Sequence, residues 1–187
     1  MKYLIVGLGN VGAEYINTRH NIGFTILDAL ADASNVVFTT SRHAYSTQIK
    51  FKGRTLVLIK PTTYVNLSGK SVNYWMQKEK IPLDKVLIIV DDLAIPFGTL
   101  RLKEKGGDAG HNGLKDINST LGTQKYARLR FGIGDNFNAG HQVNYVLGNW
   151  DRKELITLPE RIDKAIEFIK GFATIGVKRT MNQYNNS

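Results

Sequence analysis

Short apolar runs and two-residue alternation divide the chain into predicted strands. A continuous apolar run is typical of a strand that is covered on both faces, whereas alternation is typical of a strand with one covered face. The predicted strands span residues 2–6, 46–51, 54–60, 86–90, 99–103 and 127–133. Lys52 and Gly53 separate the second strand from the third, which predicts a hairpin with a tight turn.

Apolar residues that recur three or four positions apart predict helices between these strands. The predicted helices span residues 21–32, 69 to about 77, a segment that follows residue 113, and 152–170. Asp151 and Glu154 resemble a capping box at the start of the last helix, and Gly171 predicts its end. Interleaved strands and helices predict an α/β fold, a single domain over residues 1–187 with a twisted, mixed and mostly parallel sheet flanked by helices.

Composition supports one folded domain. The chain has 187 residues, of which 42% are hydrophobic, and this excludes a disordered tail. Cysteine is absent, which excludes disulfides and thiolate metal sites. The longest apolar run, residues 86–90, is too short to cross a bilayer, and an early glycine at Gly7 argues against a signal peptide. We therefore expect a cytoplasmic protein with no membrane partner.

The charge balance favours a polyanionic partner. Lys and Arg number 25 against 16 Asp and Glu, a formal net charge of +9. Residues 101–130 hold seven of the cations against three acids. Arg101 and Lys103 share one face of their predicted strand, as do Arg128 and Arg130 of theirs. These positions predict either a nucleic-acid contact or a solvated sheet edge that blocks strand pairing.

A G-x-G-x-x-G pattern at Gly7, Gly9 and Gly12 directly follows the first predicted strand. This pattern is typical of nucleotide-dependent oxidoreductases, in which a helix opens within the glycines and presents its amides to a pyrophosphate. Here the apolar period of the next helix starts about nine residues later, and no acidic residue ends a second strand at the expected distance. The pattern therefore remains only as an alternative.

Polar residues after predicted strands mark the candidate site. Asp91 directly follows the buried strand 86–90, at the end of a sheet where α/β proteins usually place their ligands. Four glycines lie within residues 106–113, which predicts either main-chain amides that hold an anion or a flexible loop. The four histidines show no paired metal-ligand spacing, so no metal is expected.

Several segments together are similar to one enzyme family. They read VGLGN, TRHN, PTTYVNLSGKSV, VDDLAIPFGTLRLK, GHNGLKDI and RLRFGIG, in order along nearly the whole chain. With these segments the chain resembles the bacterial-type peptidyl-tRNA hydrolases. The resemblance implies a monomeric α/β enzyme without metal or organic cofactor. Such an enzyme hydrolyses the ester between a peptide, or another N-blocked aminoacyl group, and tRNA, and so recycles tRNA during translation.

The resemblance also assigns roles to residues of this sequence. His20 matches the histidine that activates water, and Asp91 matches the carboxylate that fixes its tautomer. The third residue matched to the catalytic group is Asn10. The residues matched to peptide binding and the substrate entrance are Asn66, Asn112, His111 and Tyr64. The residues matched to tRNA binding are Lys103, Arg130 and, more weakly, Arg101.

Five residues depart from the usual family pattern, in the substrate channel or its surroundings: Val11, Val65, Val90, Ala94 and Asp108. Every catalytic position is nevertheless occupied as the resemblance implies. Two other classes of function stay open at this point. One is the oxidoreductase of the glycine pattern, and the other is a non-catalytic RNA-binding protein, which would need no His20–Asp91 pair.

Overall fold

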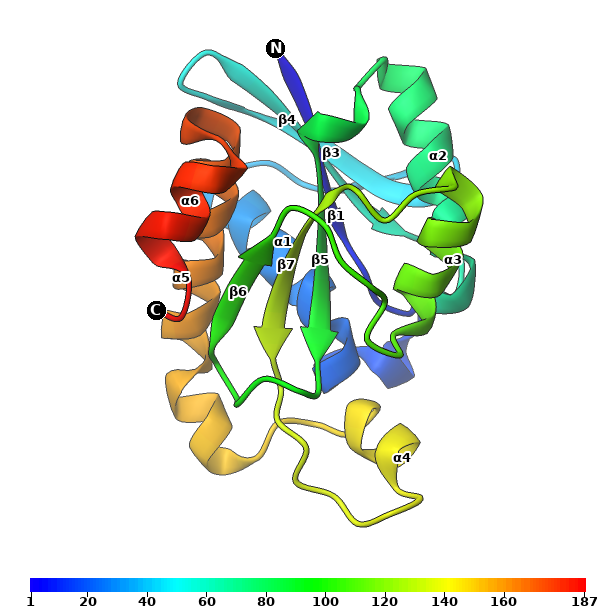
Figure 1. Cartoon of the computed structure of the whole chain (residues 1–187), viewed down its shortest axis with the longest axis vertical. Helices are drawn as coiled ribbons and strands as arrows, with labels where there is room; N and C mark the ends of the chain where they lie inside the picture. The colour runs from blue at the N-terminus through cyan, green and yellow to red at the C-terminus, as the bar shows by residue number, and fades with distance from the viewer.

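Seven strands form one sheet in the order β2-β3-β4-β1-β5-β7-β6 in the computed structural model, which describes residues 1–187 (Figure 1). Their bounds are β1 Lys2–Gly7, β2 Thr39–Ser41, β3 Ala44–Phe51, β4 Arg54–Pro61, β5 Val86–Asp92, β6 Leu100–Lys103 and β7 Ala127–Gly132. The central strands β4, β1, β5 and β7 are parallel, whereas β2, β3 and β6 each pair antiparallel. The predicted α/β fold with a mixed, mostly parallel sheet is confirmed.

Helices cover both faces of this sheet, because alternate residues of each buried strand point to opposite sides. One face packs against α1 (Ile22–Ala33) and α5 (Arg152–Ile175), with α6 (Val177–Tyr184) beside α5. The other face packs against α2 (Ser68–Glu79) and α3 (Asn112–Leu121). The short α4 (Gln142–Val146) lies beyond the arrowheads of β5 and β7 (Figure 1). No helix combines the length and hydrophobicity that crossing a membrane requires.

Four short 3-10 turns complete the chain, and two of them carry site residues: η1 Ala13–Tyr15, η2 Arg19–Asn21, η3 Val65–Leu67 and η4 Leu83–Lys85. The turn η2 leads directly into α1, which lies very close to β1. A Cβ atom on Gly7 would lie 2.3 Å from the carbonyl oxygen of Gly23. Glycine at both positions therefore brings η2 to the carboxyl end of the sheet.

The glycine pattern of residues 7–12 does not open a helix. It is followed by an irregular segment, and α1 begins only at Ile22. The N–H of Leu8 donates to the carbonyl of Ile89, and the N–H of Asn10 donates to a side chain. No helix N-terminus lies within the glycines and two of their neighbouring amides are used within the protein, so the oxidoreductase alternative loses its structural basis.

The predicted end of the last helix at Gly171 is wrong. The capping box of Asp151 and Glu154 starts α5 as expected, but the helix continues through Gly171 to Ile175. A Cβ atom on Gly171 would lie 2.9 Å from Oγ1 of Thr180 in α6. This glycine therefore serves the close packing of two helices, and the packing outweighs its weak helix propensity.

The outer edge of β6 is closed by the end of the chain. The side-chain amide of Asn185 accepts the N–H of Leu102 at 2.7 Å through Oδ1 and donates through Nδ2 to the Leu102 carbonyl at 3.0 Å. The N–H of Asn186 donates to the carbonyl of Leu100. A side chain thereby satisfies the main-chain groups that a further strand would otherwise pair with.

Candidate active site

A cavity of about 510 Å³ opens at the carboxyl end of the parallel strands. Eight of the ten residues that the sequence predicted for the site line this cavity: Asn10, His20, Tyr64, Asn66, Asp91, His111, Asn112 and Arg130. Segments far apart in the chain supply them, because β1, β4, β5 and β7 end together. Arg101 and Lys103 lie outside the cavity lining on β6.

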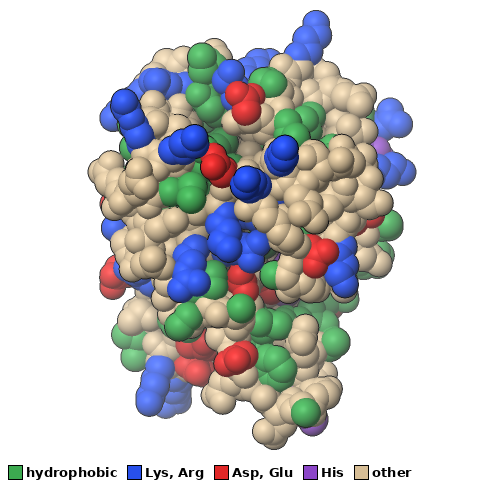
Figure 2. All heavy atoms as spheres, viewed as in Figure 1, with side chains coloured by type: hydrophobic (Ala, Val, Ile, Leu, Met, Phe, Trp, Pro, Cys, Tyr) green, Lys and Arg blue, Asp and Glu red, His purple; other side chains and the backbone are tan.

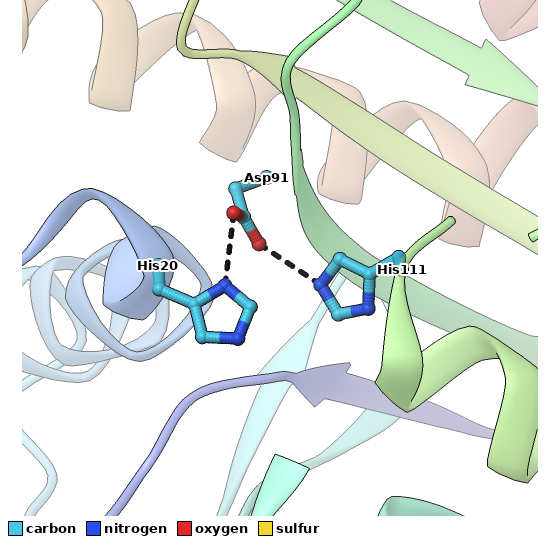
Figure 3. Close-up of side chains that lie close together, drawn as sticks. All are labelled: His20, Asp91 and His111. Atoms are coloured by element: carbon cyan, nitrogen blue, oxygen red, sulfur yellow. Dashed lines mark hydrogen bonds and ion pairs between the residues drawn. The ribbon is translucent and has the colours of Figure 1, made fainter. Parts of the chain in front are cut away.

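His20 and Asp91 form the centre of the site. Nδ1 of His20 lies 2.9 Å from Oδ2 of Asp91, and the carboxylate is only 6% exposed at the end of β5 (Figure 3). A carboxylate accepts hydrogen bonds, so Nδ1 carries the proton and Nε2 keeps its lone pair. The RNA-binding alternative needs no such pair and would be favoured by a large separation of these side chains, so the observed pair favours an enzyme instead.

Each member of the pair changes the acidity of the other. Burial alone would lower the pKa of His20, but the charge of Asp91 and the hydrogen bond to it outweigh burial and raise this pKa above its ordinary value. Burial alone would raise the pKa of Asp91, but the two neighbouring imidazoles hold it well below its usual range. Asp91 is therefore ionised, and His20 is a stronger base than a free imidazole.

His111 donates to the other oxygen of the same carboxylate. Its Nε2 lies 2.9 Å from Oδ1 of Asp91, so the two rings flank Asp91 (Figure 3). Its Nδ1 accepts the N–H groups of Gly113 and Leu114 and caps α3. Because Nδ1 is an acceptor, the proton of the neutral ring resides on Nε2.

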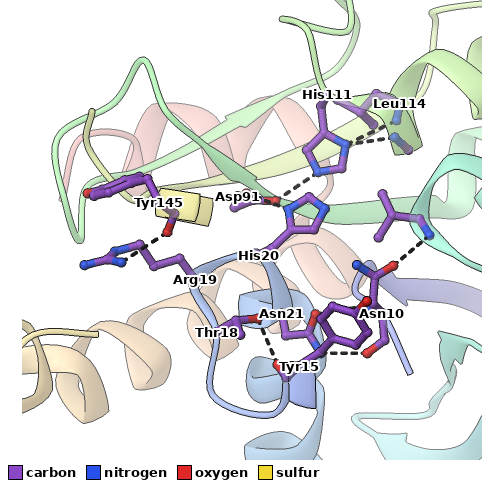
Figure 4. A network of polar contacts seen from close by, with 12 residues as sticks. Asn10, Tyr15, Thr18, Arg19, His20, Asn21, Asp91, His111, Leu114 and Tyr145 are labelled. Atoms are coloured by element: carbon purple, nitrogen blue, oxygen red, sulfur yellow. Dashed lines mark hydrogen bonds and ion pairs between the residues drawn. The ribbon is translucent and has the colours of Figure 1, made fainter. Parts of the chain in front are cut away.

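Asn10 is fixed in one orientation. Its Oδ1 accepts the N–H of Val65 at 3.0 Å, which leaves Nδ2 as the free end of the amide. The Asn21 side chain holds the Asn10 main chain on both sides, accepting its N–H and donating to its carbonyl at 2.9 Å (Figure 4). Asn10 thus offers the cavity a donor and no free acceptor. The sequence did not single out Asn21, whose position in T-R-H-N was the only available signal.

Asn66 lies in η3 and Asn112 lies at the start of α3, and both residues line the cavity. Neither side chain makes a hydrogen bond within the chain, so both amides are free to donate and to accept. Tyr64 is 61% exposed at the rim. The sequence missed an apolar wall of the cavity, formed by Val143, Val146 and Leu147 in and after α4.

Arg130 lines the cavity but is largely occupied by protein partners. Its Nη1 lies 3.2 Å from Oδ2 of Asp92, and its Nη2 donates to the carbonyl of Gly107 at 3.0 Å. Arg128 is fully buried and donates to carbonyls of the same loop. The solvated-edge interpretation is therefore wrong for these two arginines, which fasten the glycine-rich loop to β7.

Lys103 and Arg101 are exposed on β6, directly opposite the two buried arginines. Lys103 forms no ion pair, and Nε of Arg101 donates to Oδ1 of Asn186 at 2.8 Å. Lys and Arg side chains extend across the upper and central part of the face on which β6 and β7 are seen (Figure 2). This part of the surface carries the positive potential that the charge count predicts.

The glycine-rich loop uses part of its main-chain amides within the protein. The N–H groups of Gly106, Gly110 and His111 donate to protein oxygens, and the first turn of α3 is capped by the His111 side chain. Neither of the two alternatives for residues 106–113 is settled by these contacts, because the N–H groups of Gly107, Asp108 and Ala109 have no acceptor within the chain. The loop positions His111 beside Asp91.

His20, Asp91 and His111 bring three ligand-type atoms within 4.8 Å of one another. A metal ion on Nε2 of His111 would force the ring proton onto Nδ1. That proton would then point at the N–H groups of Gly113 and Leu114, which would lose the acceptor they now have. The donor set therefore does not fit a metal ion while α3 keeps this cap.

Comparisons with known proteins identify the family of this chain. The sequence profile of the peptidyl-tRNA hydrolase family matches residues 4–187. A peptidyl-tRNA hydrolase of Phocaeicola vulgatus is 64% identical over 185 residues, which cover 99% of both chains, and one of Bacteroides fragilis is 60% identical over the same length and coverage. The crystal structure of peptidyl-tRNA hydrolase from Acinetobacter baumannii superposes with a TM-score of 0.91 at 37% identity, over 98% of this chain and 94% of that one. The chain belongs to the peptidyl-tRNA hydrolase family.

Proposed function

We propose that this chain hydrolyses the ester bond of peptidyl-tRNA by means of a water molecule that His20 activates. One observation carries the mechanism. Asp91 accepts a hydrogen bond from the protonated Nδ1 of His20, which leaves Nε2 of His20 free. Both residues line a cavity into which Asn10 offers a fixed hydrogen-bond donor. A near-neutral base beside an electrophile-binding donor is the arrangement that ester hydrolysis needs.

The reaction has two steps. Nε2 of His20 takes a proton from water as the water oxygen bonds to the ester carbonyl carbon, and Nδ2 of Asn10 donates to the oxyanion that forms. The tetrahedral intermediate then breaks its bond to the ribose oxygen, which receives the proton from Nε2. The products are a free peptide carboxyl group and a tRNA hydroxyl. Asp91 stays ionised and stabilises the imidazolium between the steps.

Free amides give the site its tolerance of peptide sequence. Asn66 and Asn112 have both donor and acceptor available, so they suit the N–H and C=O groups that every peptide carries. His111 and Tyr64 border the same cavity, where Tyr64 offers an exposed ring. In an N-blocked substrate the amino group is part of an amide, and the peptide beyond it can lie along this lining. We therefore expect N-blocked substrates to be preferred over free aminoacyl-tRNA.

For the tRNA moiety we propose phosphate contacts with Lys103 and Arg101, which are exposed on β6. Arg130 acts beside them mainly through Gly107 and the loop, because Asp92 already neutralises much of its charge. A monomer without metal or organic cofactor suffices for this chemistry. We propose that the enzyme acts in the cytoplasm, where translation makes its substrate.

An ester-cleavage assay tests the proposal. Purified protein is incubated with N-acetyl-aminoacyl-tRNA and with free aminoacyl-tRNA of the same amino acid, and release of the amino acid is measured for each. We expect rapid cleavage of the blocked substrate only, and a loss of roughly 10²–10⁴-fold in kcat for His20→Ala, the usual range for a general base. Binding of tRNA without cleavage by the folded wild type would instead identify a non-catalytic RNA-binding protein.

A further inference from the structure

The apolar wall of the cavity is only partly attached to the hydrophobic core, through Tyr145 and Val146. It consists of α4 and the residue after it, and none of the α4 residues is buried. Val143 is 66% exposed although it lines the cavity with Val146 and Leu147. The segment is preceded by Gly134 and Gly140, both with positive φ. A five-residue helix of this kind is not stable alone, so contacts from elsewhere must hold it in place.

Arg19 supplies several of those contacts, beside the Tyr145 hydroxyl, which donates to the carbonyl of Ile133. Its main-chain N–H donates to the carbonyl of Gly148 at 3.0 Å, and its Nη1 donates to the carbonyl of Tyr145 at 3.1 Å. Its guanidinium carbon lies 4.2 Å from the centre of the Tyr145 ring. The neighbouring Thr18 forms an isolated β-bridge with Asn149. The view of the site shows the Arg19 side chain extending from the His20 turn towards Tyr145 (Figure 4).

The other end of the guanidinium is fixed to the longest helix. Nη2 of Arg19 lies 3.1 Å from Oε1 of Glu154, and both side chains are 11% exposed. The same Oε1 accepts the N–H of Asp151 at 2.9 Å as part of the capping box of α5. A planar guanidinium with two separated donors can serve a carbonyl and a carboxylate at once, which a lysine ammonium cannot do in the same geometry.

We propose that Arg19 is a positioning residue that holds the α4 wall of the substrate cavity in register with His20, its immediate neighbour in η2. The inference rests on the proposed function of the site. Arg19 touches neither Asp91 nor the Nε2 of His20, so it leaves the base unchanged and acts on the wall that the peptide contacts. One of its atoms, Nε, is buried without a partner, so the local structure tolerates a cost to keep an arginine here.

Arg19→Lys tests this role because it keeps the positive charge and removes the two separated donors of the guanidinium group. We expect KM for N-acetyl-aminoacyl-tRNA to rise roughly fivefold or more. This is the effect expected if the equilibrium between the positioned and the displaced α4 wall changes by a factor of that size. We expect kcat at saturation and the acid limb of its pH profile to stay as in the wild type, since the His20–Asp91 pair is intact. A shifted acid limb with unchanged KM would overturn the proposal.

Amide hydrogen exchange gives a readout that does not depend on activity. In Arg19→Lys we expect faster exchange in residues 141–148 and wild-type exchange in β5 and α3. Arg161→Lys is the matched control, because Arg161 also donates to main-chain carbonyls, of Gly98 and Ser187, but lies away from the cavity. Equal acceleration in both variants, or acceleration throughout the chain, would show that Arg19 serves only general stability.

Glu154→Gln provides a milder variant if Arg19→Lys does not fold. Glutamine keeps the capping box and loses only the charge that holds Arg19. We expect the same pattern of raised KM and local exchange with smaller amplitude, and an unchanged KM with unchanged exchange would contradict the proposal. Cleavage by the wild type is measured first: if the wild type fails to cleave, the proposed function fails, while the exchange experiment still reports whether Arg19 holds α4.

Discussion

Nε2 of His111 lies 2.9 Å from Oδ1 of Asp91, at the same distance as Nδ1 of His20 from Oδ2. One carboxylate therefore serves two imidazoles, of which only His20 has a free nitrogen in the cavity. The second hydrogen bond stabilises the negative charge of Asp91, and a stabilised carboxylate is a weaker acceptor for His20. His111 thus moderates how strongly Asp91 raises the basicity of His20.

Replacing His111 separates this effect from helix capping. We expect both His111→Asn and His111→Ala to shift the acid limb of kcat to higher pH, because Asp91 then acts on His20 alone. Asparagine is a good N-cap, so His111→Asn should keep wild-type stability, whereas His111→Ala should lose about 0.5–2 kcal/mol of it. The pH profile of kcat and urea unfolding measure the two effects. An acid limb that stays in place in both variants would show that Asp91 does not respond to its second donor.

Asp91→Asn should move the acid limb the other way. In the proposed mechanism neutral His20 is the base, so we expect activity to fall as the pH drops through the pKa of this histidine. Asp91 is what raises that pKa, and burial alone would lower it. We therefore expect the limb to shift to lower pH, while kcat falls by roughly 10²–10⁴-fold because the amide stabilises neither the tautomer nor the imidazolium. Near wild-type kcat in a folded variant would remove Asp91 from the mechanism.

Asn10→Asp removes a donor without changing the shape of the side chain. An aspartate can still accept the N–H of Val65, so the loop should keep its position. The cavity then lacks the Nδ2 donor and gains a negative charge where the oxyanion forms. We expect kcat to fall by at least about 10²–10³-fold, the cost of losing one oxyanion donor, with little change in affinity for deacylated tRNA. Unchanged kcat would place the oxyanion elsewhere in the cavity.

Lys103→Ala and Arg130→Ala should differ, although both remove one cation. Lys103 is exposed without an ion pair, so its loss should raise KM for the full tRNA substrate, flatten the log–log salt dependence by about one unit at most, and leave stability unchanged. Loss of Arg130 leaves Asp92 buried without its partner and should cost about 3–5 kcal/mol. Salt-dependent kinetics and denaturant unfolding distinguish the two.

A minimal substrate completes that comparison. A blocked aminoacyl ester of a short oligonucleotide has no acceptor stem, so Lys103→Ala should cleave it as the wild type does. An equal loss on both substrates would mean that Lys103 supports the chemistry or the fold. No loss on either would mean that it only protects the edge of the sheet.

Local patterns were sufficient for six of the seven strands and for the position of Asp91, but they missed the short edge strand β2, and only the family resemblance singled out His20. Buried strands consist of unbroken apolar runs, and Asp91 follows one of them at the end where parallel strands place ligands. Sequence periodicity assigned Arg128 and Arg130 to one face of β7 but could not say which layer covers that face. That layer is the glycine-rich loop, which contacts both arginines about twenty residues back along the chain.

Other features depended on partners that are remote in sequence. Arg19 finds Tyr145 and Glu154 at separations of 126 and 135 residues, beyond any local signal. The α4 segment is too short for its apolar residues to predict a helix. Its position depends on the contacts between Arg19 and Tyr145. Gly171 shows the opposite error. A local signal predicted the end of the helix there, but the packing of α6 against Gly171 lets the helix continue.

The amide of Asn185 that closes β6 has a consequence for how the protein is made. Asn185 follows Leu102 by 83 residues, so a chain growing on the ribosome exposes β6 as an open strand edge until that length has been added. At about 5–20 residues per second this interval is roughly 4–17 s. During it, the charges of Arg101 and Lys103 are the main barrier to pairing with another nascent chain. The two exposed cations are therefore expected to protect the newly made chain, a role separate from the tRNA contact proposed for them.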